Sequence, residues 1–200
     1  MPLISSPTRY AESWAQRTLG WSPADHGPSN VLGWSFDPLH ASAGGPTLTS
    51  QKTYAAAVII TQPGIPNTAY FIVQTGGSTF TSAFVGVYDE SGVLVAQSAD
   101  ISGQLGTTGL KTVTLTGVGV GLAANSGWGP GRLVYVALMQ NATTPAKLQC
   151  AGLSTAVAAA ANLASGTRFI ETTGTGTSLP NPFGANVTSA NVMWAALGIV

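Results

Sequence analysis

From residue 47 onward the chain alternates short apolar, β-branched or aromatic runs with turns rich in glycine, proline and asparagine. Inward and outward positions alternate most clearly in residues 84–88 and 133–138, and a period of two is typical of half-buried β-strands. Residues 89–92 join two of the runs as a compact hairpin turn. The pattern predicts nine strands, at residues 53–61, 69–75, 83–88, 93–98, 111–116, 132–140, 147–151, 168–172 and 191–199.

Nine strands at this spacing, without an alternation of strands and long helices, indicate an all-β fold. The expected architecture is an antiparallel β-sandwich, and within that class a jelly roll. Residues 154–165 are ambiguous, because their alanine-rich run favours a helix while strands flank it on both sides, so helix and loop both stay open. The expected core residues are Val85, Val87, Leu94, Val113, Leu115, Val134, Val136, Leu138 and Trp194, whereas Thr112 and Thr114 are expected to face outward.

The composition changes near residue 45. Residues 1–45 contain three of the five tryptophans and are rich in proline. Their end overlaps a Pro/Gly hinge at residues 43–46. Tyr10 and Trp14 lie four positions apart, which predicts one short helix within residues 7–20. We therefore expect an N-terminal attachment arm (1–45) that precedes a β-sandwich domain (46–200). The aromatic residues expected to anchor this arm are Tyr10, Trp14, Trp21 and Trp34.

Charge is scarce in this chain. Seven acidic and seven basic residues among 200 give a net charge of zero, whereas about a quarter of the residues of a typical domain are charged. No electrostatic footprint for nucleic acid or for an anionic membrane is present. The first 20 residues, interrupted by Arg9, Glu12 and Arg17, do not match a signal peptide. We expect a protein made and folded in a cytoplasm, not inserted in a membrane, and present as a homo-oligomer or in many copies whose neighbours cover much of its surface.

The residue patterns of common catalytic and metal sites do not occur. His26 and His40 lack the spacing of a zinc site, and the glycine-rich residues 117–121 do not match a phosphate-binding loop. Asp89, Glu90 and Asp100 are interpreted as turn carboxylates, with a shared calcium ion as the alternative. Cys150 is expected to be a small buried apolar residue. The sequence thus predicts a protein that is not an enzyme and has no cofactor and no metal site.

Three blocks of the chain carry a resemblance to a known family. Residues 86–100 read GVYDESGVLVAQSAD, residues 109–116 read GLKTVTLT, and residues 133–138 read LVYVAL. Together with the opening PTRY, Trp14 and LGWSP of residues 7–23, they resemble a β-sandwich module of tailed-bacteriophage virion proteins. The chain departs from that pattern at residues 117–131, where a glycine-rich insertion with Trp128 replaces a short loop.

The resemblance implies a structural protein located in a virion, with other virion proteins as partners. We expect a tail-associated protein, of the minor tail or fibre-like type, that displays its sandwich on the particle surface and assists host attachment. A capsid decoration or head-fibre protein is one alternative. A carbohydrate-binding module is the other, in which Tyr70, Tyr88 or Trp128 would stack on the sugar rings of a host-surface glycan.

Overall fold

The computed structural model describes residues 30–36, 45, 47–117, 129–152, 169–188 and 191–199. These residues form an all-β structure whose strands pair antiparallel throughout. In this part of the chain no helix has the length and apolar character needed to cross a membrane. The helix predicted in the arm and the ambiguous residues 154–165 lie outside the described residues.

Two large sheets contain most of the strands. The five-stranded sheet has the order β1-β14-β3-β6, with β9 also paired to β3. The seven-stranded sheet has the order β12-β11-β2-β8-β4-β5-β7, and β10 pairs with β13 in a separate ribbon. The strands are β1 Val31–Trp34, β2 Thr53–Ile59, β3 Thr68–Thr75, β4 Ser78–Tyr88, β5 Leu94–Gln97, β6 Gly109–Thr114, β7 Thr116–Gly117, β8 Leu133–Thr144, β9 Lys147–Leu148, β10 Cys150–Gly152, β11 Phe169–Thr172, β12 Asn186–Thr188, β13 Asn191–Met193 and β14 Ala195–Gly198, with a 3₁₀ turn, η3, at Ser102–Gln104.

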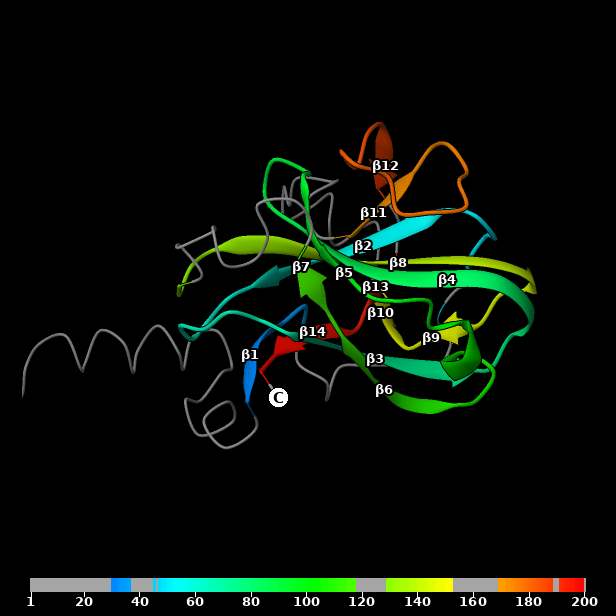
Figure 1. The fold of residues 1–200 in the computed structure, drawn as a ribbon, viewed down its shortest axis with the longest axis horizontal. Coiled ribbons are helices and arrows are strands. Elements are labelled where there is room, and N and C mark those ends of the chain that lie inside the picture. The colour runs from blue at the N-terminus through cyan, green and yellow to red at the C-terminus, as the bar shows by residue number, and fades with distance from the viewer. Residues whose placement is uncertain are drawn as a thin grey trace, which may run out of the picture.

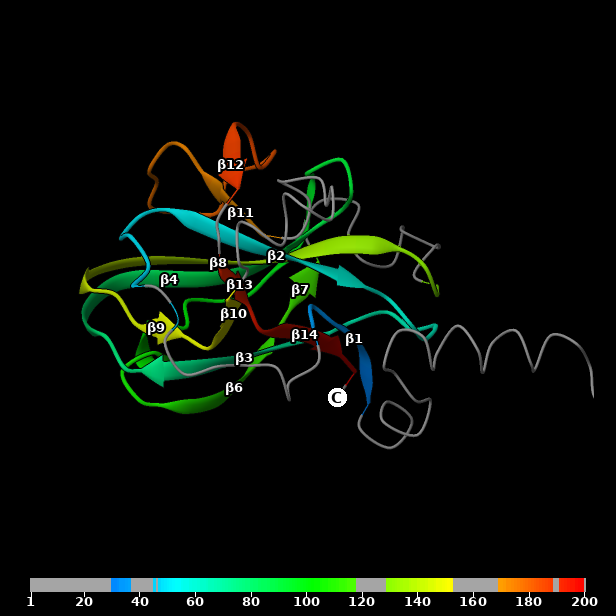
Figure 2. The ribbon, with the colours of Figure 1, turned by 180° about the vertical axis from the view of Figure 1, so that it is seen from behind.

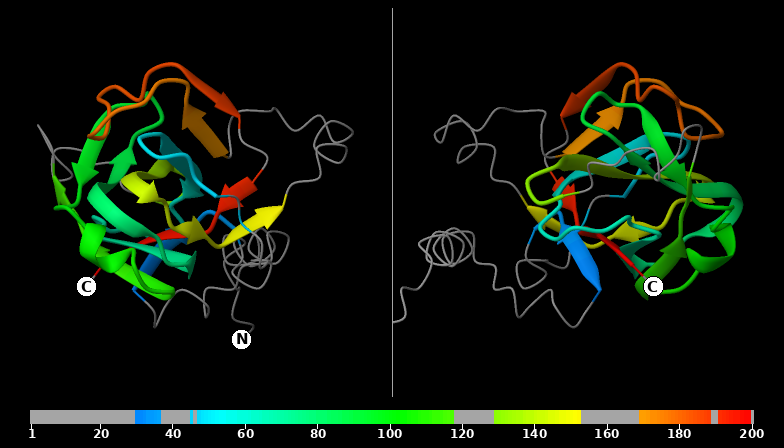
Figure 3. Two further views of the ribbon diagram at one scale, coloured as in Figure 1. Left: turned by 90° about the vertical axis from the view of Figure 1, so that its right-hand side faces the viewer. Right: turned by 60° about the vertical axis from the view of Figure 1, so that its left-hand side comes forward.

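The two large sheets face one another across the main core, as in a β-sandwich (Figures 1, 2 and 3). Phe71 and Leu197 enter this core from the five-stranded sheet, and Val58, Val85 and Val136 enter it from the seven-stranded sheet. The predicted core residues are all buried. Thr112 and Thr114 are exposed, as predicted. Burial of alternate side chains on facing sheets is therefore what holds the two layers together.

The long strands pair in a nested series. β1 pairs with β14, β2 with β8, β3 with β6, and β4 with β5. Consecutive strands from β1 to β4 alternate between the two sheets. The strands before the β4–β5 hairpin thus pair, in reverse order, with the strands after it. The first and last described strands are therefore neighbours.

Each of the nine predicted strands corresponds to observed strand structure, so the all-β, antiparallel prediction is confirmed. The strands that extend furthest beyond their predicted ranges are β4, which begins at Ser78, and β8, which continues to Thr144. The predicted strand 191–199 is divided into β13 and β14. The short strands β1 and β12 were not predicted, and β7 begins at Thr116, the last residue of the predicted strand 111–116.

Strand β1 lies inside the predicted arm and corrects its boundary. Leu32 is buried in the main core, and its carbonyl oxygen accepts hydrogen bonds from the backbone N–H (2.8 Å) and the hydroxyl (2.9 Å) of Thr61. A Cβ at Gly33 would collide with the backbone carbonyl of Ile59, so only glycine permits this close approach. Residues 31–36 therefore belong to the sandwich, which begins before residue 46.

Candidate functional site

A pocket of about 210 Å³ opens on the outer face of the seven-stranded sheet. Its base is formed by side chains of β4, β8 and β11, and its rim by the 89–92 turn and by residues 182–186. The site therefore combines segments that are far apart in the sequence.

Two tyrosines lie at the base of the pocket. Tyr88 on β4 and Tyr135 on β8 are directly opposite each other in the strand register. Their neighbours Val87 and Val136 point into the main core, so the alternation of the strands directs both tyrosines to the outer face. Burial raises the pKa of both phenols above the ordinary value of 10.0.

Tyr88 is fully covered. Its hydroxyl donates a hydrogen bond to the carbonyl oxygen of Pro180 at 2.7 Å. Its ring meets that of Phe183 edge-on, with the ring centroids 5.1 Å apart and an interplanar angle of 88°. Tyr135 is only half-buried, so of the two tyrosines it is the one that presents surface to the pocket.

The segment between β11 and β12 forms one wall of the pocket. Its residues Leu179 and Phe183 cover a second apolar cluster on the outer face of the sheet, which also contains Leu94, Met139 and Ile170. Besides the bond from the Tyr88 hydroxyl, two backbone N–H groups tie this segment to the β4–β5 hairpin. Phe183 N–H donates to the Gly92 carbonyl (2.8 Å), and Leu94 N–H donates to Asn181 Oδ1 (3.2 Å).

The 89–92 turn has the predicted hairpin geometry. Asp89 Oδ1 accepts hydrogen bonds from the backbone N–H groups of Ser91 and Val93, each at 2.9 Å. Gly92 has a φ of 79°, a left-handed conformation that glycine adopts without strain. Asp89 is engaged by its own turn, whereas Glu90 and Ser91 are exposed at the rim of the pocket.

Asp100 stabilises a different turn. Burial alone would raise the pKa of its carboxyl group, but the hydrogen bonds that it accepts from Ser102 and Ala83 outweigh burial and lower the pKa. The two backbone bonds, to Oδ1 from the N–H groups of Ala83 and Ser102, are each 2.9 Å long. Within the described ranges, no group of three or more histidine, cysteine or acidic side chains is arranged to hold a metal ion.

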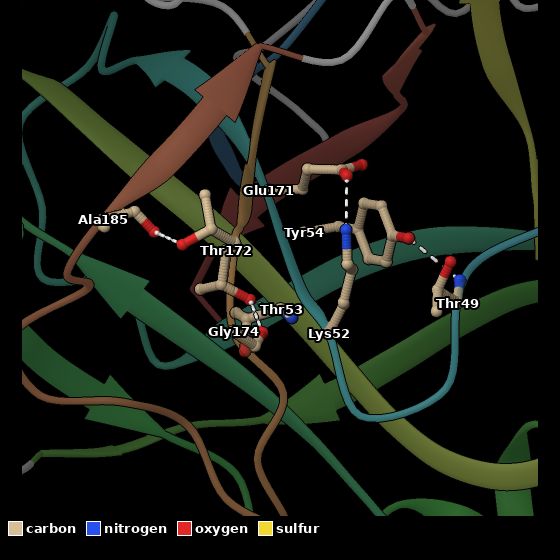
Figure 4. Close-up of polar contacts among 9 residues, drawn as sticks. Thr49, Lys52, Thr53, Tyr54, Glu171, Thr172, Gly174 and Ala185 are labelled. Atoms are coloured by element: carbon tan, nitrogen blue, oxygen red, sulfur yellow. Dashed lines mark hydrogen bonds and ion pairs between the residues drawn. The ribbon is translucent and has the colours of Figure 1, made fainter.

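Polar contacts fix β11, and with it Ile170, against the start of β2 (Figure 4). Lys52 Nζ and Glu171 Oε1 form an ion pair at 2.9 Å, and this partner raises the pKa of the lysine. Thr53 N–H donates to Thr172 Oγ1 at 3.1 Å, and the hydroxyl of Thr172 donates to the Gly174 carbonyl at 2.9 Å. These contacts hold the β11 wall of the pocket in place.

The structure places the predicted sugar-stacking residues apart. Tyr88 lies at the pocket, but its side chain has no exposed surface. Tyr70 is half-buried on the outer face of the five-stranded sheet, where its ring packs over Gly198. Trp128 lies outside the described residues.

Of the predicted anchors, Trp34 lies on β1, while Tyr10, Trp14 and Trp21 lie outside the described residues. Trp34 pairs with Ala196, and Ala196 pairs with Tyr70. Directly paired residues share one face of a sheet. Two aromatic residues predicted for separate roles thus lie on the same outer face, with the small side chain of Ala196 between them.

The residues that sequence reasoning missed are those brought to the pocket by the fold. The alternation in 133–138 contained a signal for Tyr135, because it lies between the inward-facing Val134 and Val136. Phe183 and Asn186 had no such signal, since they reach the pocket from the segment around β12.

The chain matches no family model and no curated protein. The candidate site is therefore interpreted from its geometry. The described residues that line it include one carboxylate, Glu90, and no lysine, arginine or histidine.

Proposed function

We propose that this protein is a structural component of a tailed-bacteriophage virion. In this proposal it is tail-associated, of the minor tail or fibre-like type, and displays a jelly-roll sandwich on the particle surface. It has no catalytic role and requires no cofactor.

The observation that carries the proposal is the nested strand pairing. Numbered along the chain, the eight strands β1–β6, β8 and β14 pair one with eight, two with seven, three with six and four with five. This is the pairing expected when a long antiparallel hairpin is rolled into two facing sheets of four principal strands each. Double-sheet jelly rolls of this kind occur in viral capsid proteins and lectins.

The sequence blocks that resemble phage proteins support the same proposal. They correspond to the β4–β5 hairpin with its Asp89–Gly92 turn, to β6, and to β8. The glycine-rich departure at residues 117–131 falls between β7 and β8, so it leaves the pairing of the long strands intact. The blocks therefore coincide with the framework of the sandwich.

The surface chemistry fits a protein held on a particle. The exposed positions at the start of β4 are occupied by Ser78, Thr79 and Thr81, and the outward positions of β6 include Thr112 and Thr114. A surface with few charges protects a free protein poorly against association. A chain anchored among neighbours does not depend on that protection.

Attachment is assigned to the residues that precede β1. Because residues 31–36 belong to the sandwich, the proposed anchors are Tyr10, Trp14 and Trp21. Each aromatic ring can bury roughly 150–250 Å². A contact of this kind is apolar, so salt screening has little effect on it.

The proposal is tested on purified particles from cells that make the protein. After a wash with about 1 M salt, the particles are separated into tails and filled heads and probed by immunoblot. We expect the protein in the tail fraction, with Trp14→Ala depleting it and Arg9→Ala, a charged control, having a smaller effect. Recovery with filled heads alone would favour the capsid decoration alternative, and absence from washed particles would contradict a structural role.

A further inference from the structure

We infer that the pocket on the outer face of the seven-stranded sheet binds one neutral sugar residue, a hexopyranose or an N-acetylhexosamine. This inference goes beyond the proposed function, because a structural role in a virion does not require a ligand pocket. It rests on the size of the pocket, the division of its lining into apolar and polar parts, and its charge.

The pocket has the size of one sugar ring. Its volume is about 210 Å³. Pockets for drug-sized ligands are larger, at about 300–1,000 Å³. A single ring therefore fits, whereas a longer oligosaccharide would have to extend over the rim into solvent.

The lining divides in the way that a sugar requires. The half-buried ring of Tyr135 supplies aromatic surface at the base, beside the buried side chains of Ile170 and Phe183. Glu90, Ser91 and Asn186 supply exposed oxygen and nitrogen atoms at the rim. A pyranose ring has an apolar face of C–H groups and an edge of hydroxyl groups. Its face can lie on the base of the pocket while its hydroxyl groups form hydrogen bonds with the rim.

The charge of the lining disfavours anionic ligands. With one carboxylate and no cationic side chain among the described lining residues, the pocket does not favour a phosphate or an acidic sugar. A quaternary ammonium ion is bound by the open faces of several aromatic rings. Here Tyr88 has no exposed surface and Phe183 is 5% exposed, so the half-buried Tyr135 is the one ring at the base that presents surface to the pocket. One available aromatic ring beside a polar rim is suited to the C–H face and the hydroxyl groups of a neutral sugar.

The walls of the pocket are already fixed by contacts within the protein. The Tyr88 hydroxyl is bonded to Pro180, Phe183 N–H to Gly92, and the backbone of the 89–92 turn to the Asp89 carboxylate. A ligand would thus meet a formed site and would lose little binding free energy to ordering of the protein. For one sugar ring we expect a Kd of about 1 mM or above.

The test uses the full chain and a panel of methyl glycosides of glucose, galactose, mannose, N-acetylglucosamine and N-acetylgalactosamine. Saturation-transfer NMR reports which glycoside binds, and a titration gives its Kd. We expect binding of at least one glycoside, weakened at least about tenfold by Tyr135→Ala and about threefold or more by Glu90→Gln and by Asn186→Ala.

Two matched controls should leave the Kd unchanged. Tyr70→Ala removes a tyrosine from the opposite sheet, and Val187→Ala alters the exposed neighbour of Asn186. Because Tyr135 also packs on the second apolar cluster, near-UV circular dichroism checks its variant. The exposed rim variants test the site without disturbing that cluster.

Two results would overturn the inference. One is the absence of binding by every glycoside of the panel at about 20 mM. The other is binding that the Glu90 and Asn186 variants leave unchanged, which would place the sugar elsewhere. Neither result bears on the particle fractionation, so the failure of this inference is distinguishable from failure of the proposed function.

Discussion

Replacement of Leu32 by alanine should destabilise the whole sandwich, although this residue lies in a four-residue strand outside the predicted domain. Leu32 is 3% exposed and belongs to the main core. Its methyl groups lie where a side chain at Gly64 would fall, with Leu32 Cδ2 only 3.0 Å from the position of a Cβ there. Because the atoms around Leu32 are already closely packed, they cannot move far enough to fill the cavity that a truncated side chain would leave.

The expected magnitude follows from that burial. Leucine-to-alanine changes in cores cost about 2–5 kcal/mol, and the close packing of Leu32 suggests about 3 kcal/mol. For a chain of this size, 1 kcal/mol corresponds to roughly 2–4 °C in Tm. The Tm should therefore fall by about 6–12 °C. Ile65→Ala is the matched control, because Ile65 is 49% exposed and a surface change of this kind costs at most about 0.5 kcal/mol.

The assay is thermal unfolding followed by circular dichroism and repeated on two truncated chains. A chain that starts at residue 30 retains β1 and should unfold cooperatively. A chain that starts at residue 46 lacks Leu32 and the pairing of β1 with β14, and it should unfold at a clearly lower temperature. The reasoning is refuted if Leu32→Ala and Ile65→Ala shift the Tm equally, or if both truncated chains unfold at the same temperature.

Three further predictions concern single side chains. Hydrogen bonds lower the pKa of Asp100 below its ordinary value of 3.8, so the stability that its carboxylate contributes is present above that value and is lost as the pH falls through the folded-state pKa. Urea unfolding from about pH 6 to about pH 2 should thus show a weaker acid dependence for Asp100→Asn, and an unchanged slope would count against these bonds. Cys150 is 2% exposed and burial raises its pKa to about 12, so a thiol reagent at about pH 8 should label it only as the protein unfolds, in contrast to the rapid native labelling of a reactive thiolate. Leu138→Ala should lower the Tm by several degrees while Thr112→Ala leaves it unchanged, and similar small shifts in both would mean that the strand faces are reversed.

Most of the strands can be predicted from the sequence. Each large sheet buries one face against the other, so buried and outward-facing residues alternate along its strands. In β8, for example, Val134, Val136 and Leu138 enter the main core while Tyr135 faces outward. A period of two can be read directly from such a strand. The pairing partners cannot be read in this way, because the nested order depends on contacts between distant segments.

Strand β1 shows why a local reading fails at the edge of the sandwich. The composition around it resembles an irregular arm, and Gly33 interrupts the apolar run. Its stability comes from contacts across the length of the chain. β1 pairs with β14, and just after β1 the Ser35 hydroxyl accepts a hydrogen bond of 3.0 Å from Ala195 N–H. A pattern among neighbouring residues does not indicate contacts between segments so far apart in the chain.

The candidate site was predictable only in part. Tyr88 and the 89–92 turn were identified from the sequence, but the alternation of β4 could not show that Phe183 would cover the tyrosine ring. A strand pattern tells which side chains leave the main core. Whether solvent or another segment then covers them depends on the connection between β11 and β12.

Immunogold electron microscopy of intact particles tests the central claim most directly. An antibody against the sandwich, applied to unfixed virions, reports whether the protein is displayed and where. The account predicts several gold particles per virion at one fixed position on the tail. Unlabelled virions, with the protein recovered only in the soluble lysate, would contradict it.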